Sequence, residues 1–289
     1  ANMIKHATRN QLPEEHPDYY DIHSNVACFA FKLSCPPTKS GLAAIGKKHI
    51  RIVAKSVIFG IAYGRGAKAI AVAAKEQGID ITVDEAQAVI NAIFEMYPLL
   101  RPFFDECQQR AVGNFVDPIT REQVKERYLC NCFGRFRRFP SANNDHALAA
   151  EFQRQAMNFP IQSMIASAVS RALAYIYDYK AKQLAKGKNL FKVLLQIHDA
   201  ILLEVPYEHV QHVCEYVLPT YMRNSVPLYP TKLDGIPTGD GPYYLGIEAE
   251  VMEYWGESLS NDQASKFGLP TGRGGAEGCV VNYSHGKGH

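Results

Sequence analysis

Four side chains spaced four residues apart constrain the fold and chemistry of this chain more than any other feature. They are Arg51, Lys55, Phe59 and Tyr63, in the stretch RIVAKSVIFGIAYG at 51–64. An α-helix has 3.6 residues per turn, so each step of four advances a side chain by only about 40° and the four share one slowly drifting face. The stretch therefore predicts a helix on which two cations precede two aromatic rings.

This face suits a nucleoside triphosphate. The charged groups of Arg51 and Lys55 would pair with phosphates, and a base or sugar would lie against Phe59. The same pattern also arises in a partly buried amphipathic helix whose basic side chains reach past apolar surface to water. The stripe by itself leaves both interpretations open.

A second stretch, LLQIHDAILLEV at 194–205, has two apolar runs rich in strand-forming residues around the polar pair His198 and Asp199. Pro206 ends the second run. This pattern predicts a β-hairpin with Asp199 at its tip. A carboxylate in that position can hold a divalent metal ion.

The two stretches together resemble motifs B and C of the family A DNA polymerases, the bacterial polymerase I family. The matching patterns are R-x3-K-x3-F-G-x2-Y-G at 51–64 and L-Q-I-H-D-x-I-L-L-E at 195–204. Three further segments resemble the family as well: DIHSNVA at 21–27, FGRFRR at 133–138 and RQAMNFPIQ at 154–162.

The resemblance covers roughly residues 18–257 and implies an α+β fold of the right-hand polymerase type, with mainly helical fingers and part of an antiparallel-sheet palm. We expect 1–20 to be a truncated entry segment and 21–127 to be the fingers. Residues 128–257 would be the C-terminal part of the palm, with a DNA-contacting hairpin and a long kinked helix. Residues 258–289 would be a flexible tail.

Local patterns add four expectations within this frame. Thr82 stands three residues before Glu85, which predicts a capping box at the start of a helix. We also expect a hairpin or loop at 114–126, a packing helix at 207–221 and a strand at Tyr243–Val251 that could join the palm sheet.

The resemblance also implies roles for individual residues. His23, Arg51 and Lys55 would clamp the triphosphate, with Arg51 and Lys55 contributing to catalysis. Phe59 and Tyr63 would shape the base and sugar pocket. The catalytic metal ligand would be Asp199.

Primer-template DNA would be held by a second group of side chains. Arg135, Arg137 and Arg138 form a basic cluster with interleaved phenylalanines, which suits a DNA backbone but also suits a solvated strand face. By resemblance, four further residues would contact the primer end. They are Arg154, Asn158 and Gln162, which share one helix face, and His198 of motif C.

The implied activity is template-directed DNA synthesis, in which a primer 3′-OH attacks a dNTP with the help of two Mg²⁺ ions. Motif A, which supplies another metal-binding aspartate, has no match before Asp21. We therefore expect motif A and the thumb to come from an upstream segment or a second polypeptide. Ile58 and Ala200 depart from the family, where Asn and Glu are usual.

Composition adds limits rather than a function. A net charge of +2 over 289 residues is too small to indicate nucleic-acid binding, so DNA contacts must come from local clusters. Seven cysteines without a framework spacing indicate reduced thiols, and no apolar run reaches the roughly 18 residues of a membrane span. We expect the cytoplasm of a bacterial or phage-infected cell, and no membrane partner.

Other interpretations stay open at this level. The chain would be half of a split polymerase, an excerpt of a longer protein, or a catalytically silent DNA-binding module that keeps the fold. A P-loop nucleotide hydrolase is a third class, because GLAAIGK at 41–47 fits G-x4-G-K. Lys48 replaces the Ser or Thr that this motif requires, and no apolar strand precedes Gly41.

Overall fold

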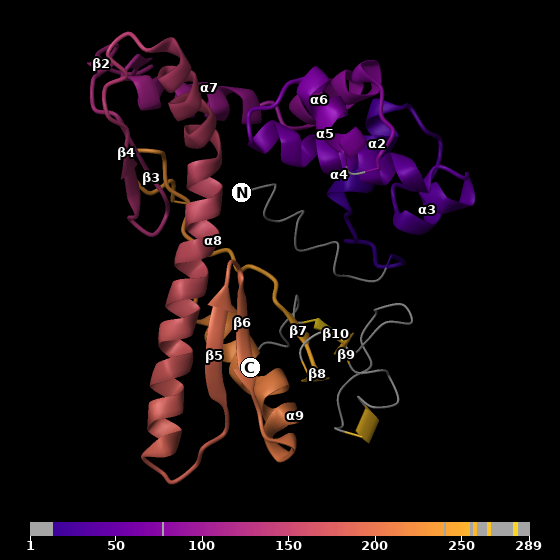
Figure 1. Cartoon of the computed structure of the whole chain (residues 1–289), viewed down its shortest axis with the longest axis vertical. Helices are drawn as coiled ribbons and strands as arrows, with labels where there is room; N and C mark the ends of the chain where they lie inside the picture. The colour runs from indigo at the N-terminus through magenta and orange to yellow at the C-terminus, as the bar shows by residue number, and fades with distance from the viewer. Residues whose placement is uncertain are drawn as a thin grey trace. The chain divides into compact units, whose positions relative to one another are not determined.

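The computed structural model divides the chain into two units of contacting residues (Figure 1). The first contains 2–163 and 231–237, and the second contains 164–230 and 238–289. The boundary between the two units does not coincide with the expected boundary between fingers and palm at 127/128. The extents of fingers and palm therefore stay a prediction. The structure describes residues 14–76, 78–239, 241–254, 257–258, 265–266 and 280–282.

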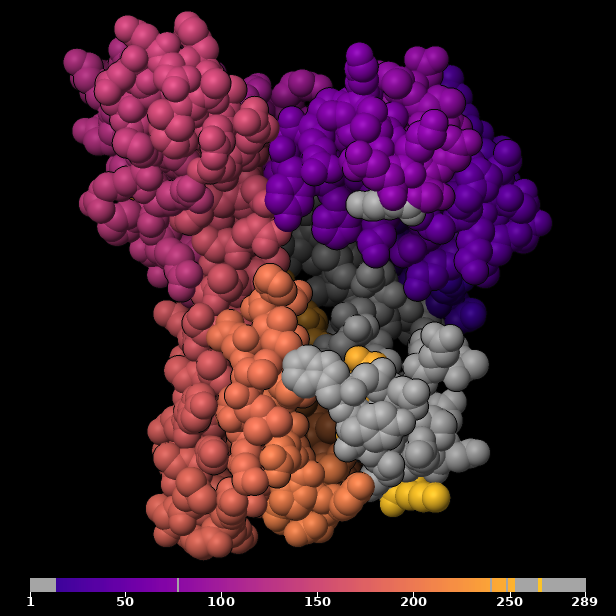
Figure 2. All heavy atoms as spheres, viewed as in Figure 1, coloured from indigo at the N-terminus to yellow at the C-terminus, as the bar shows by residue number. Residues whose placement is uncertain are grey.

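Helices dominate the first unit, and the helix expected at 51–64 is confirmed. Helix α4 (Lys48–Ala62) contacts its neighbours α2, α3, α5 and α6, and side chains fill the spaces between these helices (Figure 2). The remaining helices of this unit up to residue 112 are α2 (Ile22–Ala30), α3 (Lys39–Ala44), α5 (Ala67–Glu76), α6 (Val83–Met96) and α7 (Leu100–Val112).

One face of α4 enters the core of this helical group because its apolar residues recur at helical spacing. The buried positions are Ile50, Val53, Ala54, Val57, Gly60 and Ile61. A Cβ atom at Gly60 would lie 2.6 Å from Cγ1 of Ile70 in α5, so glycine permits the close approach of the two helices. Burial of this face turns the charged and aromatic stripe outward.

Local signals in the sequence set several helix ends. Thr82 and Glu85 form the predicted capping box, with the Glu85 amide donating to Thr82 Oγ1 over 3.1 Å and the Thr82 amide donating to Glu85 Oε2 over 2.9 Å. A cap of this kind stabilises a helix by about 1 kcal/mol. Helix α7 ends at Gly113, whose φ of 74° is the left-handed conformation that glycine adopts easily.

Two short hairpins follow in the first unit. Strands β1 (Phe115–Val116) and β2 (Gln123–Val124) pair antiparallel, which confirms the hairpin or loop expected at 114–126. Strands β3 (Tyr128–Cys130) and β4 (Phe136–Arg138) pair antiparallel in the FGRFRR region. The Cys130 amide donates to the carbonyl oxygen of Leu233 over 2.9 Å, which attaches 231–237 to this unit.

Helix α8 (His146–Leu184) is the predicted long helix, and it continues through Pro160. Its C-terminal part belongs to the second unit, with β5 (Lys192–Ile197) and β6 (Ala200–Glu204). The helix expected at 207–221 is helical, but most of it is a π-helix. Its parts are η1 (Tyr207–His209), α9 (Val210–His212) and η2 (Val213–Asn224).

The prediction of one strand over Tyr243–Val251 is largely wrong, because only Glu248–Glu250 of this range form a strand. Tyr243 instead exchanges two backbone hydrogen bonds with Leu228, of 2.7 and 2.9 Å, in an isolated bridge. Strand β7 (Glu248–Glu250) pairs with β10 (Val280–Asn282) and does not extend the β5–β6 pair. Strands β8 (Met252–Tyr254) and β9 (Glu257–Ser258) form another pair.

The described residues are therefore mostly helical with small, two-stranded antiparallel sheets. Of the predicted entry segment at 1–20, residues 1–13 lie outside the described residues, and so does nearly all of the predicted tail at 258–289. Within the described part of the chain, no helix combines the length and apolar character needed to cross a membrane.

Candidate nucleotide and primer-template site

The outward face of α4 presents the predicted stripe to solvent. Phe59 is 54% exposed and Tyr63 is 49% exposed. The Lys55 ammonium lies 6.0 Å from the centroid of the Phe59 ring, at the outer limit of a cation–π contact. These three side chains are accessible to a ligand.

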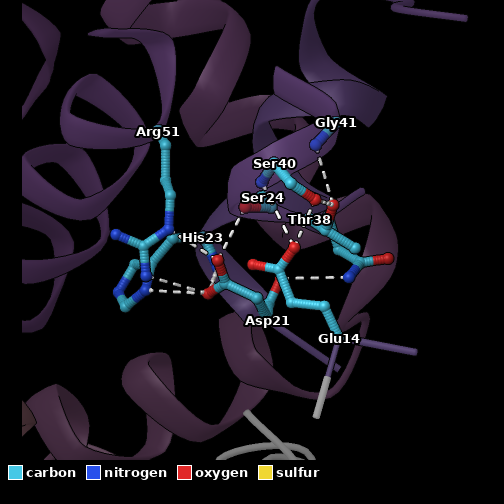
Figure 3. A network of polar contacts seen from close by, with 9 residues as sticks. Glu14, Asp21, His23, Ser24, Thr38, Ser40, Gly41 and Arg51 are labelled. Atoms are coloured by element: carbon cyan, nitrogen blue, oxygen red, sulfur yellow. Dashed lines mark hydrogen bonds and ion pairs between the residues drawn. The ribbon is translucent and has the colours of Figure 1, made fainter. Parts of the chain in front are cut away.

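Arg51, on the same stripe, is held quite differently. Its Nε donates to Oδ2 of Asp21 over 2.5 Å, and its Nη2 donates to Oδ1 over 3.2 Å (Figure 3). This is a bidentate, charge-assisted pair, a strong and directional form of hydrogen bonding. Asp21 is fully buried and Arg51 is 20% exposed, so the guanidinium closes over the carboxylate.

Asp21 holds its place because it caps the start of α2. Its carboxylate accepts from the amide of His23 over 3.3 Å and from Oγ of Ser24 over 2.6 Å. Nδ1 of His23 is buried 3.4 Å from Oδ1 of Asp21, a contact that becomes an ion pair when the ring is protonated. One carboxylate therefore brings together the side chains of Arg51 and His23, two predicted phosphate contacts.

Electrostatics keep this carboxylate ionised. Burial by itself raises the pKa of Asp21, but the donors of His23, Arg51 and Ser24 together outweigh burial and hold the pKa well below its usual range. Sequence reasoning missed Asp21 as a functional residue. Its signal was present: an Asp directly before a helix is a preferred N-cap, and here it stands two residues before His23.

The end of α4 leads to the predicted primer-template face of α8. Gly64 has a φ of 69°, and a Cβ atom there would lie 3.2 Å from Cγ of Arg154. Met157, one helical turn further, is buried in the same core as α4. The structure thus places Arg154 beside the end of the stripe, while Asn158 and Gln162 follow at four-residue spacing, half-buried and exposed respectively.

The β3–β4 hairpin carries the predicted basic cluster. Arg135, Arg137 and Arg138 are all exposed. Arg137 donates to Oε1 of Gln155, which ties this strand to α8. The Arg138 guanidinium carbon lies 4.4 Å from the centroid of the Phe136 ring, so this arginine stacks on its neighbour. The Arg137–Gln155 contact holds β4 next to the α8 surface that begins at Arg154.

In the second unit, the predicted hairpin with Asp199 at its tip is confirmed. Ile197 pairs with Ala200, which leaves His198 and Asp199 as a two-residue turn. His198 has a φ of 50°, a left-handed conformation that costs a non-glycine residue about 1 kcal/mol. Asp199 is exposed. Among the described residues, no three His, Cys, Asp or Glu side chains gather into a metal site.

The Gly41–Lys47 stretch does not have the conformation of a P-loop. A phosphate-binding loop needs free backbone N–H groups that converge on the phosphate. Here the Leu42 amide donates to Thr38 and the Lys47 amide donates to the Leu42 carbonyl oxygen, over 3.1 and 2.8 Å. Gly41 and Gly46 donate within the same turns. Helix formation in α3 has already used the donors that a phosphate requires.

The profile of the family described as DNA polymerase family A matches residues 3–234. The chain belongs to this family. The matched region contains both stretches that resemble motifs B and C, at 51–64 and 195–204.

Several curated proteins are similar to this family A chain. DNA polymerase I of Geobacillus stearothermophilus is 29% identical over 216 residues, which is 74% of this chain and 21% of that protein. DNA polymerase I of Caldicellulosiruptor bescii is 31% identical over 210 residues, 72% and 21% of the two chains. The DNA polymerase of Escherichia phage T5 is 28% identical over 245 residues, 78% and 26%.

A solved structure shares the fold of this family A chain. It is the POL domain of Pol1 from M. smegmatis in complex with DNA primer-template and dNTP, with a TM-score of 0.52 and 23% sequence identity. The match covers 81% of this chain and 36% of that one. The chain spans about a fifth to a quarter of the length of the curated relatives that it matches.

Proposed function

We propose that this chain is the part of a family A DNA polymerase that binds the incoming dNTP and the primer end, and that it takes part in template-directed DNA synthesis. The observation that carries the proposal is the α4 face, where a carboxylate-anchored arginine stands on the same stripe as an exposed lysine and two exposed aromatic rings. The combination fits the phosphates, sugar and base of one nucleotide.

Each side chain has a separate task in this proposal. Arg51, Lys55 and His23 pair with the triphosphate and orient it for in-line attack by the primer 3′-OH, while Phe59 and Tyr63 bound the space for base and sugar. A second set of residues holds the primer-template through phosphates and minor-groove edges: Arg135, Arg137, Arg138, Arg154, Asn158, Gln162 and His198.

Asp199 is the residue that we propose as a ligand of Mg²⁺. Mg²⁺ commonly binds through one or two carboxylates together with substrate phosphates, so an exposed carboxylate at a turn suits this ion. When bound, the pair of Mg²⁺ ions stabilises the charge that develops on the attacking and leaving oxygens. We propose that another aspartate comes from a segment outside the printed sequence, as an upstream part of the protein or a second polypeptide.

The test is primer extension with Mg²⁺ and the four dNTPs. The chain is assayed alone and then mixed with a polypeptide that carries motif A and the thumb of a family A polymerase. We expect extension in the mixture and its loss in Asp199→Ala, with Glu204→Gln on the same hairpin as the matched control. Extension that survives Asp199→Ala contradicts the proposed metal ligand.

A catalytically silent DNA-binding module is the second candidate, and one observation favours it. Position 200, where the family usually has a carboxylate beside the metal-binding Asp, is an alanine that begins β6. In this case the mixture extends no primer, but the chain still binds primer-template with an affinity that falls as salt rises. The same two assays therefore separate the candidates.

The compartment that we propose is the cytoplasm of a bacterial or phage-infected cell. Six cysteines within the described residues are free thiols: Cys28, Cys35, Cys107, Cys130, Cys132 and Cys214. Free thiols, including buried ones, are typical of proteins kept in a reducing environment. Growth of the expressing cell under oxidising and reducing conditions, followed by thiol counting, tests the assignment.

A further inference from the structure

The buried Asp21 carboxylate beneath the α4 stripe accepts hydrogen bonds from several donors at once. Asp21 has no exposed surface, and it accepts hydrogen bonds from the side chains of Arg51 and Ser24 and from the His23 amide. Its own carbonyl oxygen accepts from Nδ2 of Asn25 over 3.0 Å. Figure 3 shows the side chains of Arg51, His23 and Ser24 around this carboxylate. Residues buried in this way usually serve either folding or the position of a neighbour.

Arg51 cannot leave Asp21 without a large penalty. If the guanidinium moved out to a ligand, a fully buried carboxylate would lose its charged partner, which is strongly unfavourable. The pair therefore stays together when a ligand arrives. Nη1 of Arg51 makes no hydrogen bond with any residue that the structure describes, so this nitrogen is available to an anion while Nε and Nη2 remain on Asp21.

We infer that Asp21 is a positioning residue for triphosphate binding: it fixes Arg51 and His23 in the orientation that phosphates require. The inference rests on the proposed function and adds a residue to it. Lys55 provides the internal contrast, because its flexible side chain is exposed and has no such carboxylate partner among the described residues. A ligand must order Lys55 by itself, whereas the protein has already ordered Arg51.

The charge of Asp21 and its geometry have opposite effects on an anion, which makes the inference testable. A buried negative charge near the site repels phosphates, so its removal alone would tighten binding. Loss of the fixed guanidinium instead weakens binding, because the ligand must then order a long side chain. Our inference requires the second effect to be larger.

The experiment measures binding of inorganic tripolyphosphate to the full chain by calorimetry, well below the melting temperature of every variant. For Asp21→Asn we expect about tenfold weaker binding, the size expected when one long side chain must be ordered by the ligand. Glu106→Gln is the matched control, because Glu106 accepts from Nε of another buried arginine, Arg110, over 2.7 Å. This control should bind as the wild type does.

Measuring the effect of Asp21→Asn in two variant backgrounds separates a positioning role from a general structural effect. In Lys55→Ala, the Asp21→Asn change should again weaken binding about tenfold, because the two residues act independently. In Arg51→Ala the tenfold loss should disappear and binding should change by less than about twofold, since most of the effect passes through Arg51, and the remaining effects of lost His23 positioning and of the removed charge oppose each other. Equal losses in both backgrounds overturn the inference, and so does tighter or unchanged binding by Asp21→Asn.

The outcome for the wild type distinguishes this inference from the proposed function. Wild-type chain that binds no tripolyphosphate overturns the proposed nucleotide site and, with it, the role of Asp21. Wild-type chain that binds, together with an Asp21→Asn variant that binds equally well, overturns the role of Asp21 alone. Ser24→Ala, which removes one donor and keeps the carboxylate, should bind within about twofold of wild type.

Discussion

Arg51 and Asp199 are the central charged residues of two regions that are organised in opposite ways. Arg51 lies on a helix and is held by a buried carboxylate 30 positions earlier in the sequence. Asp199 lies at the exposed tip of a hairpin and makes no ion pair with the described residues. The comparison shows that the fold already orients Arg51, one of the proposed phosphate contacts, whereas it leaves Asp199, the proposed metal ligand, exposed.

This difference follows from the chemistry of the two groups. A guanidinium is planar and can use one edge for the protein and still offer another nitrogen to a ligand. A carboxylate that must bind a metal keeps its oxygens available, so the fold leaves it in water. The hairpin places Asp199 in a defined two-residue turn with the left-handed His198.

The largest difference between the two regions should appear in the free energy of unfolding when each charged side chain is replaced by alanine. Arg51→Ala should lower the free energy of unfolding by about 2–4 kcal/mol, because it leaves the Asp21 carboxylate buried without its cation. Asp199→Ala should change it by less than about 0.5 kcal/mol, as expected for an exposed side chain. Urea denaturation followed by circular dichroism measures both. Similar values for the two variants would contradict the difference drawn here.

Acid provides a second and smaller test. The pKa of folded Asp21 is lowered, so the group stabilises the fold above its unfolded pKa of about 3.9, and this contribution is lost as pH falls below that value toward the folded pKa. Between pH 5 and pH 3, wild type should lose about 1 kcal/mol more stability than Asp21→Asn. Parallel pH profiles for the two proteins would show that folding leaves the pKa of Asp21 unchanged and would contradict the stabilised carboxylate.

A small effect should also come from the ion pair of the hairpin itself. Lys192 Nζ lies 2.9 Å from Glu204 Oε1, but both side chains are more than half exposed. Exposed pairs of this kind contribute about 0–1 kcal/mol and are screened by salt. Lys192→Ala should therefore change the free energy of unfolding by less than about 1 kcal/mol, with no effect on tripolyphosphate binding. A larger loss would mean that the hairpin is more tightly organised than its exposure indicates.

Sequence alone predicted the parts of this molecule that depend on near neighbours. The outward stripe of α4 follows from helical spacing, the capping box from Thr82 and Glu85, and the Asp199 turn from two apolar runs around a polar pair. Each signal is complete within about fifteen residues. The roles assigned to the site residues are not tested by these features and stay predictions.

What sequence did not predict depends on distant partners. Nothing near Asp21 indicates that an arginine 30 positions later will cover it, because only packing of α2 against α4 brings the two together. The strand expected at Tyr243–Val251 had suitable residues, but its first residue is paired with Leu228. Backbone pairing of this kind is decided by the tertiary fold and not by strand propensity.

The shared burial of Asp21 and Arg51 also bears on how this sequence can change during evolution. A substitution of Arg51 alone leaves a buried charge, and a substitution of Asp21 alone releases a long cation from its place. We expect either single step to impair the protein, whereas a paired replacement avoids both defects. Among descendants of this sequence the two positions should therefore be inherited together or lost together, even though 29 residues separate them in the gene product.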